Sequence, residues 1–204
     1  MKLVVVGGQA RKVGKTSVIT GLIRGLNTLG WTAVKISHHA DDDCPDAPWV
    51  DDLPTHLDFL LSEESNPKGR GDTCRYLAAG ARRALWMRAR GGSLGQALPG
   101  LLEALEGDEH AIIESSSIMA FLQPAVSLLV IGESERELKA SARQFLGRAD
   151  AFVTVRPDLK PLTWPATSLQ TLEGKPVFLV SPDEWSNPAL CQFVHDRLAA
   201  AEVR

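Results

Sequence analysis

The order of apolar and polar residues predicts strands that alternate with helices along the chain. Short continuous apolar runs are typical of strands buried on both faces of a parallel sheet. These runs lie at residues 3–6, 32–36, 84–89, 111–114, 127–131, 151–155 and 176–180, and a shorter candidate lies at 56–61. Strands that alternate with helices form βαβ units, so the pattern predicts a mostly parallel sheet.

Helical periodicity fills the segments between these runs. Apolar positions 18, 19, 22, 23 and 26 form one helical face, which is expected to end before Gly30. A second helix is predicted over Asp72 to Arg83, with Asp72 as its N-cap. A third is predicted over Pro99 to Leu105, with the proline in its first turn. The last two are predicted over residues 138–146 and 190–198.

We expect a single domain over residues 1–204, because no linker or internal repeat divides the sequence. Residues 38–71 are rich in Asp, Pro and Gly and are expected to be an irregular region that carries switch or substrate contacts. The 44% hydrophobic and 23% charged residues are ordinary for a globular domain.

Charge and cysteine content narrow the classes of partner. A net charge of −3 argues against a nucleic-acid surface, which needs clustered Lys and Arg. No apolar run reaches membrane-spanning length, and the first is too short for a signal peptide. The three cysteines form no C-x-x-C pair, which fits a reducing compartment. We therefore expect a cytoplasmic protein that binds neither nucleic acid nor membrane.

The turn between the first strand and the first helix, GGQARKVGKTS at residues 7–17, predicts phosphate binding. In a P-loop the lysine reaches the β- and γ-phosphates and the following hydroxyl ligates Mg²⁺. A helix N-terminus also favours anions. The gap between the two outer glycines is one residue longer than usual, and the alternative is a turn without a ligand. The expected nucleotide contacts are Gly8, Arg11, Lys12, Val13, Gly14, Lys15, Thr16 and Ser17.

Acidic and imidazole side chains follow two other predicted strands. Glu114 ends the run AIIE and is expected to join Thr16 at Mg²⁺, the alternative being a glutamate that faces solvent. His38, His39 and Asp41 belong to SHHADDD, residues 37–43, at the edge where ligands of open α/β sheets gather. They are the catalytic candidates. A transition-metal site with Cys44 and a solvated acidic loop are the alternatives.

Four segments together resemble the molybdopterin-guanine dinucleotide biosynthesis protein B family. They are the loop above, VKISHH, GDTCRYLAAGA at residues 71–81, and AIIESSS, and the resemblance covers about residues 1–120. The family consists of P-loop GTP-binding proteins related to dethiobiotin synthetase and the nickel-insertion GTPases. The matching family positions are His38, His39, Asp41, Asp72, Thr73, Arg75, Ala79, Gly80 and Ala81.

The resemblance implies a three-layer αβα P-loop NTPase fold with a mostly parallel, doubly wound sheet. It also implies GTP and Mg²⁺ as ligands, a homodimer, and as partners a molybdopterin-type cofactor with the enzyme that attaches its nucleotide. The chain departs from the family where Lys12 replaces a glycine and where Ser115 follows Glu114 in place of glycine. Residues 43–71 are also longer than the resemblance implies.

The sequence leaves the base and the reaction open. Asp158 follows a late strand, where guanine-specific proteins place an aspartate, but a Pro-Asp turn is the alternative, so ATP stays possible. One hypothesis is a slow Mg²⁺-dependent NTPase that assists assembly of the molybdenum cofactor guanine dinucleotide. A second is an ATP-dependent ligase or kinase of the dethiobiotin synthetase type, and a third is a nucleotide-binding adaptor with little turnover. The expected substrate contacts are Lys35, Asp72, Thr73 and Arg75.

Overall fold

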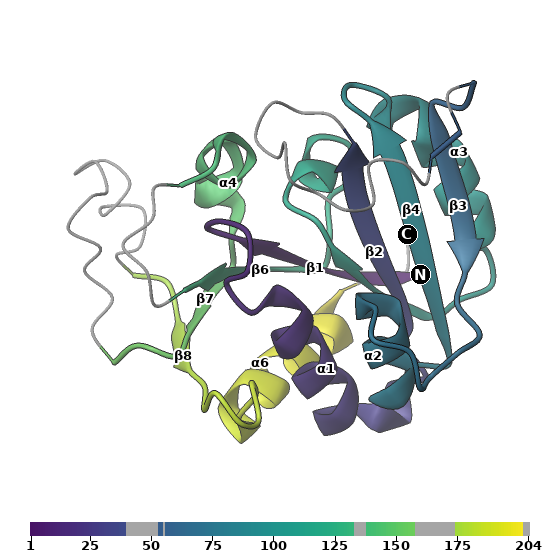
Figure 1. Ribbon diagram of the computed structural model, residues 1–204. Helices are drawn as coiled ribbons and strands as arrows, with labels where there is room; N and C mark the ends of the chain where they lie inside the picture. The colour runs from purple at the N-terminus through teal and green to yellow at the C-terminus, as the bar shows by residue number, and fades with distance from the viewer. Residues whose placement is uncertain (40–52, 55, 133–137, 158–173, 202–204) are drawn as a thin grey trace.

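A twisted sheet flanked by helices on both faces forms the centre of the molecule (Figure 1). The computed structural model describes residues 1–39, 53–54, 56–132, 138–157 and 174–201. Within these residues the sheet has eight strands in the order β3-β4-β2-β5-β1-β6-β7-β8. Only β3 runs antiparallel to its neighbour. The strands are β1 Lys2–Gly8, β2 Thr32–His39, β3 Phe59–Glu63, β4 Arg83–Arg90, β5 His110–Glu114, β6 Val126–Ile131, β7 Ala151–Thr154 and β8 Val177–Leu179.

The helices divide between the two faces of the sheet. The α-helices are α1 Lys15–Gly25, α2 Asp72–Ala78, α3 Leu94–Ala104, α4 Ala140–Phe145 and α6 Pro188–Ala200. The short 3₁₀-helices are η1 Asn27–Leu29, η3 Ser117–Ala120 and η4 Leu146–Arg148. Figure 1 shows α1, α2 and α6 together on one face and α3 and α4 on the other.

Alternating side chains of β1 build two separate cores. Val4 and Val6 pack into a cluster with buried residues of α1, α2 and α6. Leu3 and Val5 pack into a cluster with buried residues of α3. A strand whose side chains are buried on both faces is a continuous apolar run, as its sequence predicts. The three-layer αβα architecture with a mostly parallel sheet is confirmed.

Strand register brings the later site residues together at the carboxyl edge. Glu114 lies opposite Val6 on one side and Lys35 on the other. β1 then ends at Gly8, and the chain turns into α1. Ligands of open α/β sheets bind at this edge.

The predicted strands are present, with two changes around the region predicted to be irregular. β2 continues to His39, where it pairs with Arg90 of β4, so the two histidines belong to the strand backbone. β3 occupies residues 59–63 rather than 56–61 and pairs antiparallel with β4.

Two helix predictions are wrong at their ends. α2 stops at Ala78 because Gly80 adopts a left-handed φ of 106°. The Ala81 N–H then donates to the Tyr76 carbonyl, as in a Schellman cap. The N-cap of α2 is Gly71, and Asp72 is the first helical residue.

α3 begins at Leu94, so Pro99 lies inside the helix and not in its first turn. Burial of Leu94, Ala97 and Leu101 on the sheet outweighs the hydrogen bond that the proline removes.

The thiols of Cys74 and Cys191 are free. Among the described helices, none combines the length and the apolar character that crossing a bilayer requires.

Candidate functional site

The loop between β1 and α1 turns sharply twice before the helix begins. Lys12 has a φ of 57° and Gly14 a φ of 95°, and Gly14 is the N-cap of α1. No side chain caps this helix end, so its first backbone N–H groups are available to an anion. Lys12 therefore adopts a left-handed backbone conformation at the position where the resembled family has glycine.

Close contacts fix the base of this loop. A Cβ atom on Gly8 would lie 2.7 Å from Lys15 Cδ and 2.8 Å from Val13 Cγ2, so only glycine fits there. The Gly8 N–H donates to Ser116 Oγ over 3.2 Å, which ties the end of β1 to the segment after β5. Val13 is buried in the core cluster below α1. Gly8 and Val13 thus shape the loop by packing.

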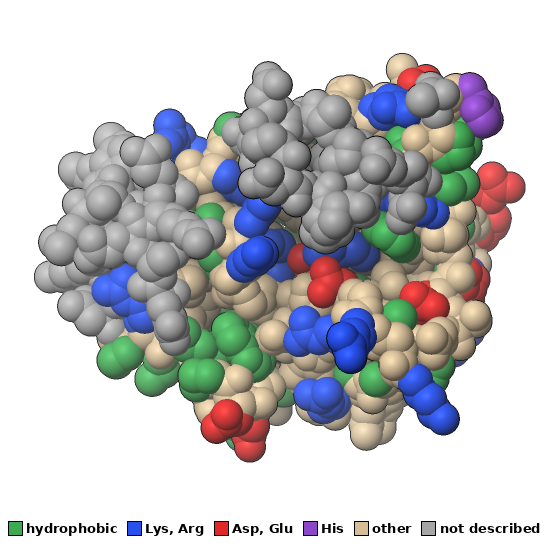
Figure 2. All heavy atoms as spheres, in the orientation of Figure 1, with side chains coloured by type: hydrophobic (Ala, Val, Ile, Leu, Met, Phe, Trp, Pro, Cys, Tyr) green, Lys and Arg blue, Asp and Glu red, His purple; other side chains and the backbone are tan. Residues whose placement is uncertain are grey.

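The Lys15 ammonium group folds back over the loop. Its Nζ lies 3.4 Å from the Ala10 carbonyl oxygen and 3.8 Å from Glu114 Oε1. Burial lowers the pKa of Lys15, and the Glu114 carboxylate only partly offsets that effect. Figure 2 shows Lys and Arg side chains gathered beside acidic ones where this loop lies in Figure 1.

Glu114 is the acceptor on which the polar side chains of the site converge. Lys35 Nζ lies 2.5 Å from its Oε1, and Thr16 Oγ1 donates to its Oε2 over 2.7 Å. The buried Tyr76 hydroxyl donates to the same Oε2. Burial on its own would raise the pKa of Glu114, but the ammonium groups of Lys35 and Lys15 lower it overall. Glu114 is therefore an anion at neutral pH, and its 2% exposure excludes the alternative of a glutamate that faces solvent.

Lys35 bridges two carboxylates from different elements. Its Nζ lies 2.8 Å from Asp72 Oδ2 and 2.5 Å from Glu114 Oε1. Burial would lower the pKa of Lys35, but these two carboxylates raise it. The ion pairs connect β2, β5 and α2 at one point, so the lysine stays charged there.

The side chains of Thr16 and Glu114 fit a magnesium ion. Adjacent oxygens of an octahedral Mg²⁺ site lie about 2.9 Å apart, because each Mg–O bond is about 2.0–2.1 Å long. The Thr16 and Glu114 oxygens are 2.7 Å apart. The described residues contain no group of three or more His, Cys, Asp and Glu side chains able to hold a metal. Mg²⁺ would thus need further oxygens from phosphate and water, as is usual for this ion.

Arg75 and Thr73, two of the predicted substrate contacts, bond to different partners. Arg75 Nη2 donates to Ser17 Oγ over 2.9 Å and joins α2 to the first turn of α1. Thr73 instead donates to Glu64 Oε2 over 3.0 Å. The structure therefore groups Lys35, Asp72 and Arg75 around the loop and separates Thr73 from them.

The remaining predicted residues divide into two groups. Arg11 and Lys12 are exposed on the outside of the loop. His38 and His39 lie in the backbone of β2 at the carboxyl edge. Asp41 and Asp158 lie outside the described residues.

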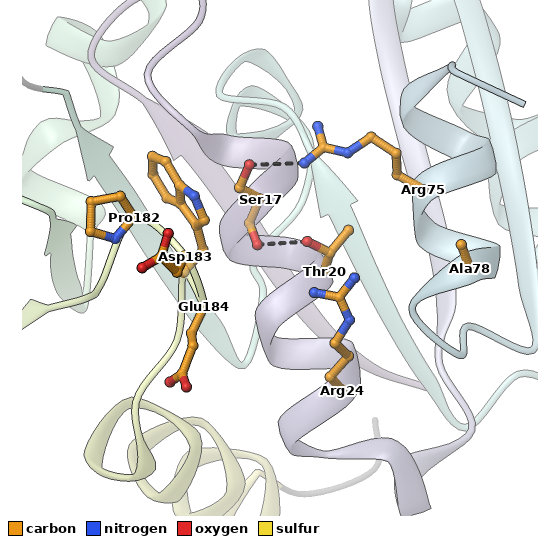
Figure 3. A pocket seen from close by; sticks show the side chains of 9 residues that line it. Ser17, Thr20, Arg24, Arg75, Ala78, Pro182, Asp183 and Glu184 are labelled. Atoms are coloured by element: carbon orange, nitrogen blue, oxygen red, sulfur yellow. Dashed lines mark hydrogen bonds between the residues drawn. The ribbon is translucent and has the colours of Figure 1, made fainter.

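A cavity of about 260 Å³ opens beside the first turns of α1 (Figure 3). Its lining comes from one face of α1, from α2 and from the segment before α6: Ser17, Thr20, Arg24, Arg75, Ala78 and residues 182–185. The Trp185 ring closes on the loop, because a Cβ atom on Gly14 would lie 1.9 Å from its Cζ3. The cavity is thus continuous with the N-terminal turn of α1 at Ser17.

Sequence reasoning did not assign three residues that the structure brings to the site. Tyr76 is four residues after Asp72, a spacing that places both on one helix face and could have revealed it. Trp185 and Lys139 come from distant segments, and no local pattern points from them to the loop. The pKa of Lys139 is lowered to about 8, chiefly by burial and next by the nearby Lys15 ammonium group.

The solved structures that resemble this chain include HypB and LpxK. HypB from Helicobacter pylori, solved in complex with nickel, matches with a TM-score of 0.50 and 15% identity over 96% of this chain and 86% of HypB. The chain has the P-loop NTPase fold. LpxK from Aquifex aeolicus, solved in an "apo" form with ATP, matches with a TM-score of 0.48 and 17% identity over 87% of this chain. The chain spans about half of LpxK, 53% of its length. No protein-family model and no curated protein matches the sequence.

Proposed function

We propose that this P-loop protein binds a nucleoside triphosphate with Mg²⁺ and hydrolyses it slowly. One observation carries the proposal: Lys15 and Thr16 begin α1 at an uncapped helix N-terminus, with the Thr16 hydroxyl 2.7 Å from the buried carboxylate of Glu114. An ammonium group, a hydroxyl and free N–H groups at one helix end are what a polyphosphate and its metal require.

Each side chain of the site has one role in this proposal. Lys15 neutralises the β- and γ-phosphates, and Ser17 contacts the α-phosphate at the mouth of the cavity. Thr16 and Glu114 hold Mg²⁺, which when bound supplies charge neutralisation to the phosphate oxygens. Lys35 holds the Glu114 carboxylate in place through its 2.5 Å contact. Catalysis then consists of positioning and electrostatic stabilisation.

The finer identity of the ligand rests on the sequence resemblance. GTP is favoured over ATP, and the pathway is assembly of a guanine dinucleotide molybdenum cofactor. The partners are then a molybdopterin-type cofactor and the enzyme that attaches its nucleotide, and the assembly state is a homodimer. His38 and His39, at the end of β2, and Asp41 beyond it supply the switch or substrate contacts, and Asp158 contacts the base.

A second function is favoured by the charged residues beside the loop. Lys35, Asp72 and Arg75 lie around the N-terminus of α1 and could bind a small acidic acceptor. That arrangement suits an ATP-dependent ligase or kinase, which would release phosphate only when its acceptor is present. A nucleotide-binding adaptor, the third hypothesis, would bind its nucleotide tightly and release no phosphate.

Calorimetry on a lysine variant tests nucleotide binding. Lys15→Ala should weaken binding of both GTP and ATP by about 100-fold or more, since it removes a charge-assisted contact to the phosphates. Lys2→Ala, at the opposite end of β1, serves as the matched control and should bind as the natural protein does. Equal affinities of Lys15→Ala and the natural protein would refute the proposal.

Calorimetry on a carboxylate variant tests the metal site. Glu114→Gln should keep nucleotide contact but raise the Mg²⁺ concentration needed for tight binding by about 10-fold or more. An unchanged Mg²⁺ dependence would remove Glu114 from the metal site. Mass spectrometry of the nucleotide that co-purifies with the protein tests the choice of base. Guanine would favour the GTP-binding hypothesis, and adenine would favour the ATP-dependent ligase or kinase.

A further inference from the structure

Lys139 is held against the phosphate loop by the backbone of Gln9, the first residue after β1. The Lys139 N–H donates to the Gln9 carbonyl over 2.9 Å. The Gln9 side-chain Oε1 accepts from the Gly132 N–H over 3.2 Å. A Cβ atom on Gly132 would lie 2.9 Å from Val13 Cγ1, so this glycine also packs directly on the loop. The start and the end of segment 132–139 are therefore both fixed to the loop.

The Lys139 ammonium group shares the electrostatic environment of the site. Lys15, Lys35 and Arg11 act on it as like charges, and Glu114 acts on it as the opposite charge. Burial is the largest of the influences that together lower its pKa to about 8. Within the described part of the chain its side chain makes no hydrogen bond or ion pair, whereas Lys35 has two carboxylate partners. Lys139 is thus a desolvated cation placed beside other cations.

Among the described residues, the positive charges around the loop outnumber the negative ones. Lys15, Lys35 and Lys139 have two described carboxylates near them, Glu114 and Asp72. Unbalanced charge in a partly buried site is costly unless a counter-charge is bound. A triphosphate would supply that counter-charge.

The sheet order places Lys139 on the opposite side of the loop from Glu114. β1 lies between β5, which ends in Glu114, and β6, which leads toward Lys139. A phosphate chain on the loop would therefore lie between Lys35 and Glu114 on one side and Lys139 on the other. In a P-loop the lysine reaches the β- and γ-phosphates, and Lys15 is the charged group that acts most strongly on Lys139, so Lys139 lies on the side of the loop where the terminal phosphate is expected.

We propose that Lys139 contacts the terminal phosphate of the bound triphosphate and stabilises the charge on it during transfer. The inference rests on the proposed function. In hydrolysis the water oxygen bonds to the γ-phosphorus, and the bond from that phosphorus to the bridging oxygen breaks. The electron pair of that bond stays on the β-phosphate, and the water gives up one proton as inorganic phosphate forms. Lys139 would neutralise the γ-oxygens through this step without donating a proton.

The test compares triphosphate with diphosphate affinity by calorimetry with Mg²⁺. The probes are nonhydrolysable GTP and ATP analogues against GDP and ADP, so the readout does not depend on turnover. Lys139→Met should lower the triphosphate-over-diphosphate preference by about 10-fold or more, and Lys139→Arg should retain it. Arg143→Met, one turn further on, is the matched control because its guanidinium contacts the Leu138 carbonyl instead.

The pH dependence of the same preference separates a direct contact from a structural effect. Within the described part of the chain, the other charged groups that act on Lys139 are Arg11, Lys15, Lys35 and Glu114. In the natural protein the preference should fall as the pH rises above about 8. It should not change in this range in Lys139→Met, and its fall should move to higher pH in Lys139→Arg.

Two outcomes would overturn the inference: an unchanged preference in Lys139→Met, or the same fall above about pH 8 in that variant. Either result leaves nucleotide binding itself intact. Failure of the proposed function would instead appear as tight nucleotide binding by Lys15→Ala, so the two failures are distinguishable.

Discussion

The carboxylate of Glu114 is a buried charge that the site must keep ionised. Removing a carboxylate from water is costly, and the cost is offset only when partners satisfy its oxygens. Here Lys35, Thr16 and Tyr76 each contact it. Tyr76 is itself fully buried, and burial followed by the adjacent Glu114 charge raises the pKa of its hydroxyl far above the ordinary value. The phenol therefore remains a proton donor to the carboxylate.

This network makes stability depend on pH in one direction. The folded-state pKa of Glu114 is below its ordinary value of 4.5, so its contribution is complete above that pH and is lost as the pH falls through the folded value. Glu114→Gln should lower the free energy of unfolding at neutral pH by about 3 kcal/mol, because Lys35 loses a buried partner. The deficit should shrink as the pH falls below 4.5, measured by urea unfolding over a pH series.

The control for this prediction is an exposed ion pair of the same sheet. Glu63 pairs with Arg83 at 2.8 Å, but the Glu63 side chain is 50% exposed. Glu63→Gln should lower the free energy of unfolding by less than about 1 kcal/mol at neutral pH, because exposed ion pairs contribute little to stability. Equal losses of unfolding free energy in the two variants would contradict the assignment of Glu114 as a buried, ionised carboxylate. A Glu114→Gln deficit that does not change with pH would contradict it as well.

At the scale of elements, α1 is packed closely against the segment that leads into α6. A Cβ atom on Gly21 would lie 2.7 Å from the Trp185 carbonyl oxygen, which is backbone and cannot turn away. A Cβ atom on Gly25 would lie 2.4 Å from Cys191 Sγ, a side-chain atom that can rotate. The two glycines of one helix thus differ in how far the neighbour can adjust.

Alanine substitutions at these two glycines should have opposite effects. Gly21→Ala should lower the free energy of unfolding by about 1–3 kcal/mol through overpacking. Gly25→Ala should be neutral or raise it by up to about 1 kcal/mol, because alanine favours helix. Urea unfolding measures both. A Gly21→Ala variant as stable as Gly25→Ala would show that the segment before α6 moves freely against α1.

The elements that sequence reasoning located best are those with a single dominant signal. Apolar runs in the middle of the sheet became strands that are covered on both faces, as Val4 and Leu3 illustrate on opposite sides of β1. The run that became β8, at the sheet edge, keeps Val177 and Leu179 exposed. The end of α2 is signalled by Gly80, but the predicted helix passed through this glycine to Arg83. Pro99 was misleading, since burial on the sheet overrode its preference for a first turn. Tertiary packing decided these cases.

Across the whole molecule, the site residues come from segments far apart in the chain. The motif and its acidic partner were predictable because each follows a strand, and parallel strands end at one edge. Lys139 and Trp185 were not, since their approach to the loop depends on contacts of Gln9 and Gly14 with distant backbone and side chains. The loop and Glu114 were thus predictable from the local sequence around each strand end. The positions of Lys139 and Trp185 are set by tertiary contacts that form only in the complete fold.

Binding to a site assembled in this way should stabilise the entire domain. At a ligand concentration of 100 times Kd, binding raises the free energy of unfolding by about 2.7 kcal/mol. For a domain of this size that gain should raise the Tm by roughly 5–10 °C. Thermal unfolding with and without Mg²⁺ and GTP or ATP measures the shift. Lys15→Ala should show almost no Tm shift. A shift equal to that of the natural protein would contradict the proposed nucleotide site.

The central position of β1 also has a consequence for how the polypeptide is made. Its neighbours in the sheet are β5 and β6, which span residues 110–114 and 126–131. During translation the first apolar strand must therefore wait, without its lateral partners, until more than half of the nascent chain has been synthesised. Such long-range pairing slows folding and leaves an aggregation-prone segment exposed. We therefore expect this strand to depend on early protection during synthesis, such as α1 packing back on it as it does in the native core.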